Sequence, residues 1–189
     1  MGRLDTIGLM GIDVGTTNCG VGIIYINPET LEITDIDASK MSIINNNYQL
    51  NNRLTHRLRD LYNELYNLIC NVDPITVHLE YAFINRLRPG AYGPLSQARG
   101  VIENCILDVN FNYDTTNEIL FDGYPPSIIK NAVGAKGGAN KVSILEAMLN
   151  IGEISKHIDL YTLTDDMVDG IAIAYTTLLF IRTYPEILL

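Results

Sequence analysis

The chain has 189 residues, with 13 basic and 22 acidic side chains that give a formal net charge of −9. This length favours one domain over residues 1–189, and a content of 47% hydrophobic and 19% charged residues excludes a disordered or collagen-like chain. The mean charge excludes a uniformly basic protein that coats nucleic acid.

The first part of the chain predicts three strands in an antiparallel meander. The β-rich runs are Ile7–Ile12, Val21–Ile26 and Leu31–Ile36. Residues 14–18 and the dipeptide Asn27–Pro28 lie between these runs and have the composition of turns.

The remaining elements alternate between helices and strands. After an Asn-rich connector at 45–52, leucines from Leu54 onward recur every three or four residues and predict an amphipathic helix of about five turns that ends at Asp73. The later elements are a strand at 75–79, an Arg/Gly/Pro-rich loop at 86–94, a helix at 95–109, a strand at 118–121, a helix at 127–133, a glycine loop at 134–138, a helix at 141–149 and a helix from 165 to about 182 that Thr164 caps. This order predicts an α/β fold with a mixed sheet and helices on its faces.

Cysteine usage and hydropathy indicate a cytoplasmic protein. The three cysteines, Cys19, Cys70 and Cys105, are scattered without a metal-binding spacing, so reduced and mostly buried thiols are expected rather than disulfides or a zinc site. Residues 1–8 do not resemble a signal peptide. No apolar stretch reaches the roughly 18 residues that a membrane helix needs, and the run 171–181 is expected to be a buried helix.

The charge is unevenly distributed along the chain. Residues 53–141 carry equal numbers of basic and acidic side chains, so the acidic excess lies in the flanks. Three local groups of basic residues have the footprint of a nucleic-acid contact, although solvated surface faces would give the same pattern. These groups are Arg53, His56, Arg57 and Arg59; Arg86, Arg88 and Arg99; and Lys130, Lys136 and Lys141.

Four carboxylates form a candidate metal site. Asp13 and Glu80 each follow an apolar strand, whereas Asp166 and Asp169 are three residues apart and share one helix face, with Asp165 as an alternative to Asp166. Carboxylates that gather without a cation repel one another. Hard oxygen ligands suit Mg²⁺ or Mn²⁺ better than zinc. Individually, these acids could instead cap a turn or offset a helix dipole.

The order of these motifs resembles the RuvC-type Holliday junction resolvases of the RNase H-like superfamily, from about residue 7 to 181. GLMGIDVGTTNCGVGII contains Asp13, HLEYAFI contains Glu80, and DDMVDGIAIAY contains the final acid pair. SQARGVIE and SIIKNAVGAKGGANKVSI are also similar to family segments, and the latter places Lys130 and Lys141 eleven residues apart. The turn at 14–17 and the loop at 85–93 depart from the family pattern.

The resemblance implies an RNase H-like fold with a mixed five-stranded sheet, and a symmetric homodimer that cuts two opposing strands of a four-way DNA junction in recombination and repair. It implies one or two Mg²⁺ ions per subunit, or Mn²⁺, held by Asp13, Glu80, Asp166 and Asp169 as the catalytic acids. The DNA contacts it implies are Lys130, Lys141 and Phe83 at the crossover, and the local basic groups add Lys136, Arg86, Arg88 and Arg99 as further candidates. Phe83 could equally pack in the core, and the helix at 95–109 is a candidate dimer surface.

Other functions remain as alternatives. GIDVGTTN resembles the first phosphate-binding hairpin of the sugar kinase/Hsp70/actin superfamily, whose members bind ATP, but the chain has no second copy of that motif. Another RNase H-like nuclease that acts on RNA, such as a pre-16S rRNA nuclease, would also use Asp13. A catalytically inactive junction-binding protein is a further alternative, which the four intact acids disfavour.

Overall fold

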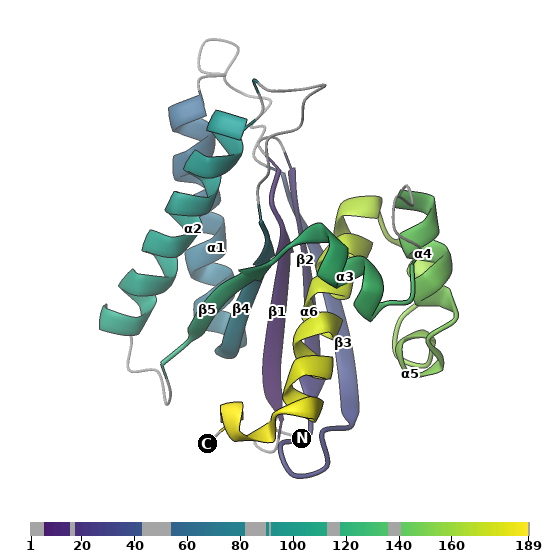
Figure 1. The fold of residues 1–189 in the computed structure, drawn as a ribbon. Helices are drawn as coiled ribbons and strands as arrows, with labels where there is room; N and C mark the ends of the chain where they lie inside the picture. The colour runs from purple at the N-terminus through teal and green to yellow at the C-terminus, as the bar shows by residue number, and fades with distance from the viewer. Residues whose placement is uncertain are drawn as a thin grey trace.

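A mixed five-stranded sheet lies between two layers of helices (Figure 1). The computed structural model describes residues 6–15, 18–42, 54–81, 90, 92–112, 118–135 and 141–188. The strands are β1 (Ile7–Asp13), β2 (Asn18–Ile26), β3 (Ile33–Ser42), β4 (Pro74–Glu80) and β5 (Leu120–Tyr124), in the spatial order β3-β2-β1-β4-β5. Strands β1, β2 and β3 pair antiparallel, whereas β4 pairs in parallel with β1 and with β5. The predicted meander and the predicted mixed sheet are confirmed.

Three strand boundaries differ from the prediction. Strand β2 begins at Asn18 rather than Val21, because Gly20 already pairs with Asp13. Strand β3 runs from Ile33 to Ser42 rather than 31–36, and Leu31 has a φ of 57°, which is incompatible with an extended strand. Strand β5 occupies 120–124 rather than 118–121.

The helices follow the predicted order, with small changes at their ends. They are α1 (Leu54–Val72), α2 (Tyr92–Asn112), α3 (Pro126–Ala132), α4 (Lys141–Leu149), α5 (Gly152–Ser155) and α6 (Asp165–Thr183), with single turns η2 (Leu160–Thr162) and η3 (Pro185–Leu188). Helix α2 begins three residues early because Pro94 is tolerated in a first turn, where an N–H has no helical acceptor. Thr164 is the N-cap residue of α6, but its side chain makes no capping hydrogen bond.

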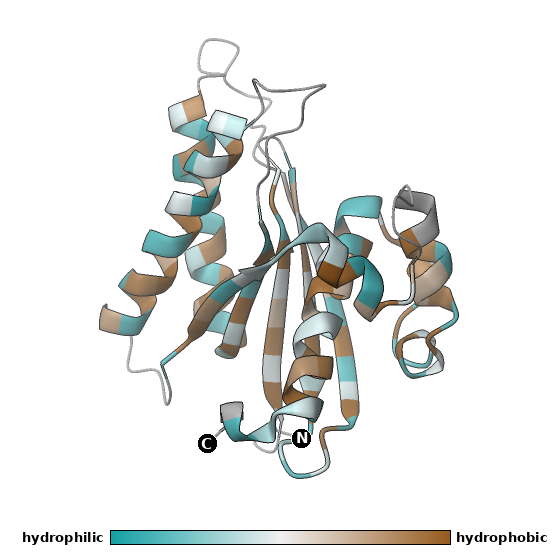
Figure 2. Cartoon of the chain, in the orientation of Figure 1, coloured by the Kyte–Doolittle hydropathy of each residue, from teal (hydrophilic) through white to brown (hydrophobic). Residues whose placement is uncertain are grey.

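Each face of the sheet has its own hydrophobic core. The core on one face joins the sheet to α6, α3 and α4, and includes Leu9, Ile24 and Ile171. The core on the other face joins the sheet to α1 and α2, and includes Ile12 and Leu79. Figure 2 shows hydrophobic residues along the strands and along α6. Residues 171–178 and 181 of α6 are buried, as expected for that run. Among the described residues, no helix combines the length and apolar content needed to cross a bilayer.

Glycines let α6 lie directly on β1 and β2. A Cβ atom at Gly20 would overlap the carbonyl of Asp166 and lie 2.6 Å from the backbone nitrogen of Met167. A Cβ atom at Gly22 would overlap the backbone of Ile171. Only glycine permits so close an approach of two backbones. These contacts fix the first turns of α6 over the end of the sheet at which β1 finishes.

An ion pair between Arg182 and Glu153 connects the C-terminal end of α6 to α5. The Arg182 guanidinium donates from Nη1 and Nη2 to the two carboxylate oxygens of Glu153, each at 2.9 Å, and its Nη2 also donates to the Leu31 carbonyl at 3.0 Å. The Tyr175 hydroxyl donates to Glu153 Oε1 at 2.7 Å. The bonds from Arg182, together with that from Tyr175, hold the pKa of Glu153 below its ordinary value.

Glu153→Gln is expected to lower the free energy of unfolding at neutral pH by about 1 to 2 kcal/mol, because Arg182 and Tyr175 lose a charged acceptor that is about one-third exposed. Since the folded-state pKa of Glu153 is lowered, this stabilisation is present above the ordinary carboxyl pKa of 4.5 and is lost as the pH falls through the folded value. Urea denaturation of both proteins at pH 7 and pH 3 measures the difference. Glu146→Gln, at an exposed site in α4, is the control, and equal stability of wild type and Glu153→Gln at pH 7 would contradict the expectation.

Candidate active site

Cross-strand pairing aligns two of the predicted acids at one end of the sheet. Ile12 pairs with Leu79 across the parallel strands β1 and β4, and Asp13 and Glu80 are the next residues in their strands. On the outer sides, Asp13 pairs with Gly20 and Glu80 pairs with Tyr124. Neighbouring strands are about 4.8 Å apart. Asp13 and Glu80 therefore occupy adjacent positions in one row across the sheet.

The strand alternation directs both acids toward α6. Ile12 and Leu79 belong to the core beneath α1 and α2. Successive residues of a strand point to opposite faces of a sheet. Asp13 and Glu80 consequently face the side on which α6 packs, where both are partly exposed.

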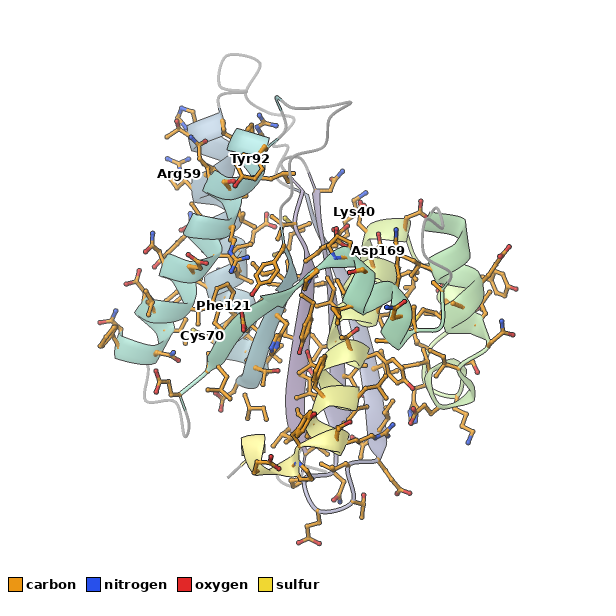
Figure 3. The ribbon with its side chains drawn as sticks, viewed as in Figure 1. Lys40, Arg59, Cys70, Tyr92, Phe121 and Asp169 are labelled. Carbon is orange, nitrogen blue, oxygen red and sulfur yellow. The ribbon has the colours of Figure 1, made fainter. Side chains whose placement is uncertain are left out.

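The first turns of α6 bring the other two acids to the same end. The backbone of Asp166 lies against Gly20, which is the cross-strand partner of Asp13. Asp169 lies three residues further along α6 and therefore on the same helix face as Asp166. Figure 3 shows Asp169 at this end of the sheet. The alternative ligand, Asp165, is exposed at the first residue of α6.

The pKa of the buried Cys19 thiol is raised in part by the negative charge of this region. Burial is the main cause that raises the pKa of Cys19 to about 12, and the charges of Asp13 and Asp166 contribute to this rise. Both carboxylates therefore act on one neighbouring side chain. Cys19 Sγ donates to the Gly15 carbonyl at 3.2 Å, and the raised pKa keeps this thiol protonated at neutral pH, which makes it a poor nucleophile.

The donor chemistry fits a hard divalent ion. Within the described residues, no three His, Cys, Asp or Glu side chains are arranged as a metal site. The four predicted ligands nevertheless offer only carboxylate oxygens, the donors that Mg²⁺ and Mn²⁺ prefer. His78 stacks on Tyr124 with 4.8 Å between ring centroids, and burial lowers its pKa to about 4, so it is neutral near pH 7. Metal binding by the four acids stays a prediction, supported by their chemistry and backbone positions.

The predicted DNA contacts are only partly described. Lys130 lies half-buried in the last turn of α3, and Lys141 begins α4, although the side chain of Lys141 lies outside the described part of the structure. Phe83, Arg86, Arg88 and Lys136 all lie outside the described residues.

Arg99 is engaged within the subunit rather than free on the surface. Its Nε donates to Glu103 Oε1 at 2.9 Å, and its guanidinium lies 4.7 Å from the ring centroid of Tyr81. The Tyr81 hydroxyl in turn donates to Asp122 Oδ1 at 2.7 Å. A Cβ atom at Gly123 would lie 2.7 Å from the Tyr81 ring, so this glycine makes room for it. These contacts anchor the residue directly after Glu80.

Lys40 is a candidate site residue that the sequence pattern did not indicate. This residue pairs with Gly20 on the side opposite Asp13 and thus belongs to the same row as the acids. Figure 3 shows Lys40 at the same end of the strands as Asp169. Lys40 belongs to no local basic group, so only the pairing of β2 with β3 could have indicated its position.

Comparison with known sequences gives one consistent family. The sequence profile described as crossover junction endodeoxyribonuclease RuvC matches residues 9–177. A protein of that description from Brachyspira hyodysenteriae is 30% identical over 165 residues, which cover 87% of this chain and 89% of the relative. Another, from Christiangramia forsetii, is 28% identical over 169 residues, which cover 88% of this chain and 76% of the relative.

Solved structures show the same architecture. T. thermophilus RuvC in complex with a Holliday junction substrate has a TM-score of 0.68 at 16% identity, covering 94% of this chain and 97% of that one. Fowlpox virus resolvase in complex with junction DNA has a TM-score of 0.58 at 16% identity, covering 93% and 99%. These similarities confirm the expected RNase H-like fold.

Proposed function

This chain belongs to the family of crossover junction endodeoxyribonucleases RuvC, and we propose that its junction-resolving nuclease activity depends on one or two divalent ions, Mg²⁺ or Mn²⁺, held by four acids. The proposed ligands are Asp13, Glu80, Asp166 and Asp169. One observation carries the assignment: Gly20 pairs with Asp13 and also contacts the backbone of Asp166, so β1 and α6 converge beside β4. The family assignment does not favour the kinase-like or RNA-directed alternatives.

The chain's own groups have distinct tasks in phosphodiester hydrolysis. Bound divalent ions would supply a polarised phosphate oxygen and a water of lowered pKa. The four carboxylates would hold these ions at a fixed position at the end of the sheet. Lys130 in α3 and Lys141 in α4 would bind phosphates of the DNA backbone. Such contacts position a DNA strand without selecting its sequence. Phe83 would stack on a base at the crossover.

The proposed assembly is a symmetric homodimer. A four-way junction has approximate two-fold symmetry, so two identical active sites related by a two-fold axis can cut opposing strands. Helix α2 offers exposed apolar side chains for such an interface, since Leu107 is 51% exposed and Phe111 is 83% exposed. This surface extends the predicted one at 95–109 by two residues.

Cleavage of defined nucleic acids tests the proposed function. The wild-type protein is incubated with a synthetic four-way DNA junction, a linear duplex of the same sequence and an RNA/DNA hybrid, in Mg²⁺, in Mn²⁺ and in EDTA. We expect paired cuts in opposing strands of the junction with either metal, and none in EDTA. Preferential cutting of the hybrid would indicate an RNA-directed nuclease, and ATP binding without any cutting would favour the kinase-like alternative.

A further inference from the structure

Lys40 lies at the end of the row that contains the acids. Strand β3 pairs Lys40 with Gly20, and strand β1 pairs Gly20 with Asp13. Ile36 and Ala38 contribute to the core beneath α6, so the alternation of β3 directs Lys40 to that same face. Lys40 is exposed at this position. A basic side chain and the catalytic carboxylates thus share one face and one end of the sheet.

Gly20 separates Lys40 from Asp13 within the row, and the first turn of α6 lies over this glycine. Two strand spacings place the two Cα atoms roughly 10 Å apart, and an extended lysine side chain reaches about 6 Å from its Cα atom. Gly20 contributes no side chain to the space between them, and the backbone of α6 occupies the position of its missing Cβ. Lys40 and Asp13 therefore flank the first turn of α6, so a DNA strand that passes this turn can meet the Lys40 ammonium at a phosphate near the one beside Asp13.

The charge of Lys40 has no partner among the described residues. The side chain makes no hydrogen bond or ion pair with the part of the chain that the structure describes. Lys40 is also the one basic residue in the sequences of β1, β2 and β3. A lysine ammonium binds phosphate as a compact point charge. The four proposed metal ligands at this end of the sheet are acidic and would repel DNA without a nearby cation.

We propose that Lys40 binds a phosphate of the cleaved DNA strand next to the scissile bond. This inference rests on the proposed function, because it places the cleaved strand at Asp13. Contact from the β3 side complements the contacts proposed for Lys130 and Lys141, which lie on helices α3 and α4. By binding this phosphate, Lys40 positions the cleaved DNA strand over the end of the sheet, next to the carboxylates.

The first arm of the test measures junction binding in EDTA, without metal. Fluorescence anisotropy over a range of salt concentrations compares wild type with Lys40→Ala, Lys40→Arg and the control Lys156→Ala, which removes an exposed lysine at the end of α5. We expect Lys40→Ala to reduce the slope of log Kd against log salt by about one. Lys40→Arg should keep the wild-type slope, because it keeps the charge, and Lys156→Ala should also match wild type.

The second arm measures single-turnover cleavage at saturating protein in Mg²⁺. Lys40→Ala is expected to cut the junction about tenfold more slowly than wild type, with an unchanged melting temperature. If Lys40→Ala matches Lys156→Ala in slope and rate while wild type cuts junctions, the Lys40 proposal fails and the proposed function stands. A changed melting temperature with an unchanged slope assigns Lys40 to charge balance within the fold and also overturns the proposal. A wild-type protein that cuts no junction in either metal overturns both.

Discussion

Asp13→Asn is expected to slow single-turnover junction cleavage in Mg²⁺ about a thousandfold or more, while junction affinity stays within about threefold of wild type. Asparagine keeps the size of the side chain but removes a charged ligand at the row where β1, β4 and α6 converge. A loss of about 4 kcal/mol of transition-state stabilisation corresponds to this factor, and metal ions contribute several kcal/mol to such reactions. Quenched-flow or gel-based cleavage assays measure the rate, and anisotropy measures the affinity.

A neighbouring acid provides the matched control. Asp165 is exposed at the start of α6, whereas Asp166 contacts Gly20 through its backbone. Asp165→Asn is expected to cut junctions at nearly the wild-type rate, and Asp166→Asn to be as inactive as Asp13→Asn. If Asp165→Asn is inactive and Asp166→Asn is active, then Asp165 is the metal ligand and Asp166 is not. Wild-type cleavage by Asp13→Asn would contradict the proposed site itself.

Gly20→Ala is expected to destabilise the protein by about 3 kcal/mol or more. The added methyl group would overlap the carbonyl of Asp166 and lie 2.6 Å from the nitrogen of Met167. Both are backbone atoms, so no side-chain rotation relieves the overlap, and α6 must move away from β2. Because Asp166 and Asp169 move with the helix, cleavage should fall even under conditions in which the variant stays folded. Urea denaturation and the junction assay measure the two effects.

Gly100→Ala makes the same chemical change at an open position. Gly100 lies within α2, where an added Cβ would meet nothing within 4 Å. Alanine is favoured over glycine inside a helix by up to about 1 kcal/mol, so this variant should be as stable as wild type or more stable. If Gly20→Ala proves as stable as Gly100→Ala, then the close packing of α6 on β2 is not as described.

The periodic parts of the sequence predicted most of the architecture. Leucine spacing indicated α1, and apolar runs indicated the meander, because these patterns reflect burial on one side of an element. The positions of Asp13 and Glu80 at strand ends also indicated that they would meet, and the parallel pairing of β1 with β4 places them in adjacent positions. Short elements such as α5 were missed, since one helical turn has too few residues to show a period.

Contacts between distant segments could not be predicted from one sequence. The row that joins Lys40 to Asp13 depends on the register of three strands, and a shift of one residue would reverse the face that Lys40 occupies. Arg99 illustrates the same limit: its basic surroundings did not indicate that it lies over the ring of Tyr81, the residue after β4, and its contact with DNA stays a prediction. Such partners become visible only when helix and strand are placed together.

Anomalous diffraction from a crystal of the protein with junction DNA and Mn²⁺ tests the central claim most directly. We expect one or two anomalous peaks at the end of the sheet, within about 2.5 Å of carboxylate oxygens from the four proposed ligands. These ligands are Asp13, Glu80, Asp166 and Asp169. Manganese bound only at other side chains, with the cleaved strand away from this end of the sheet, would contradict it.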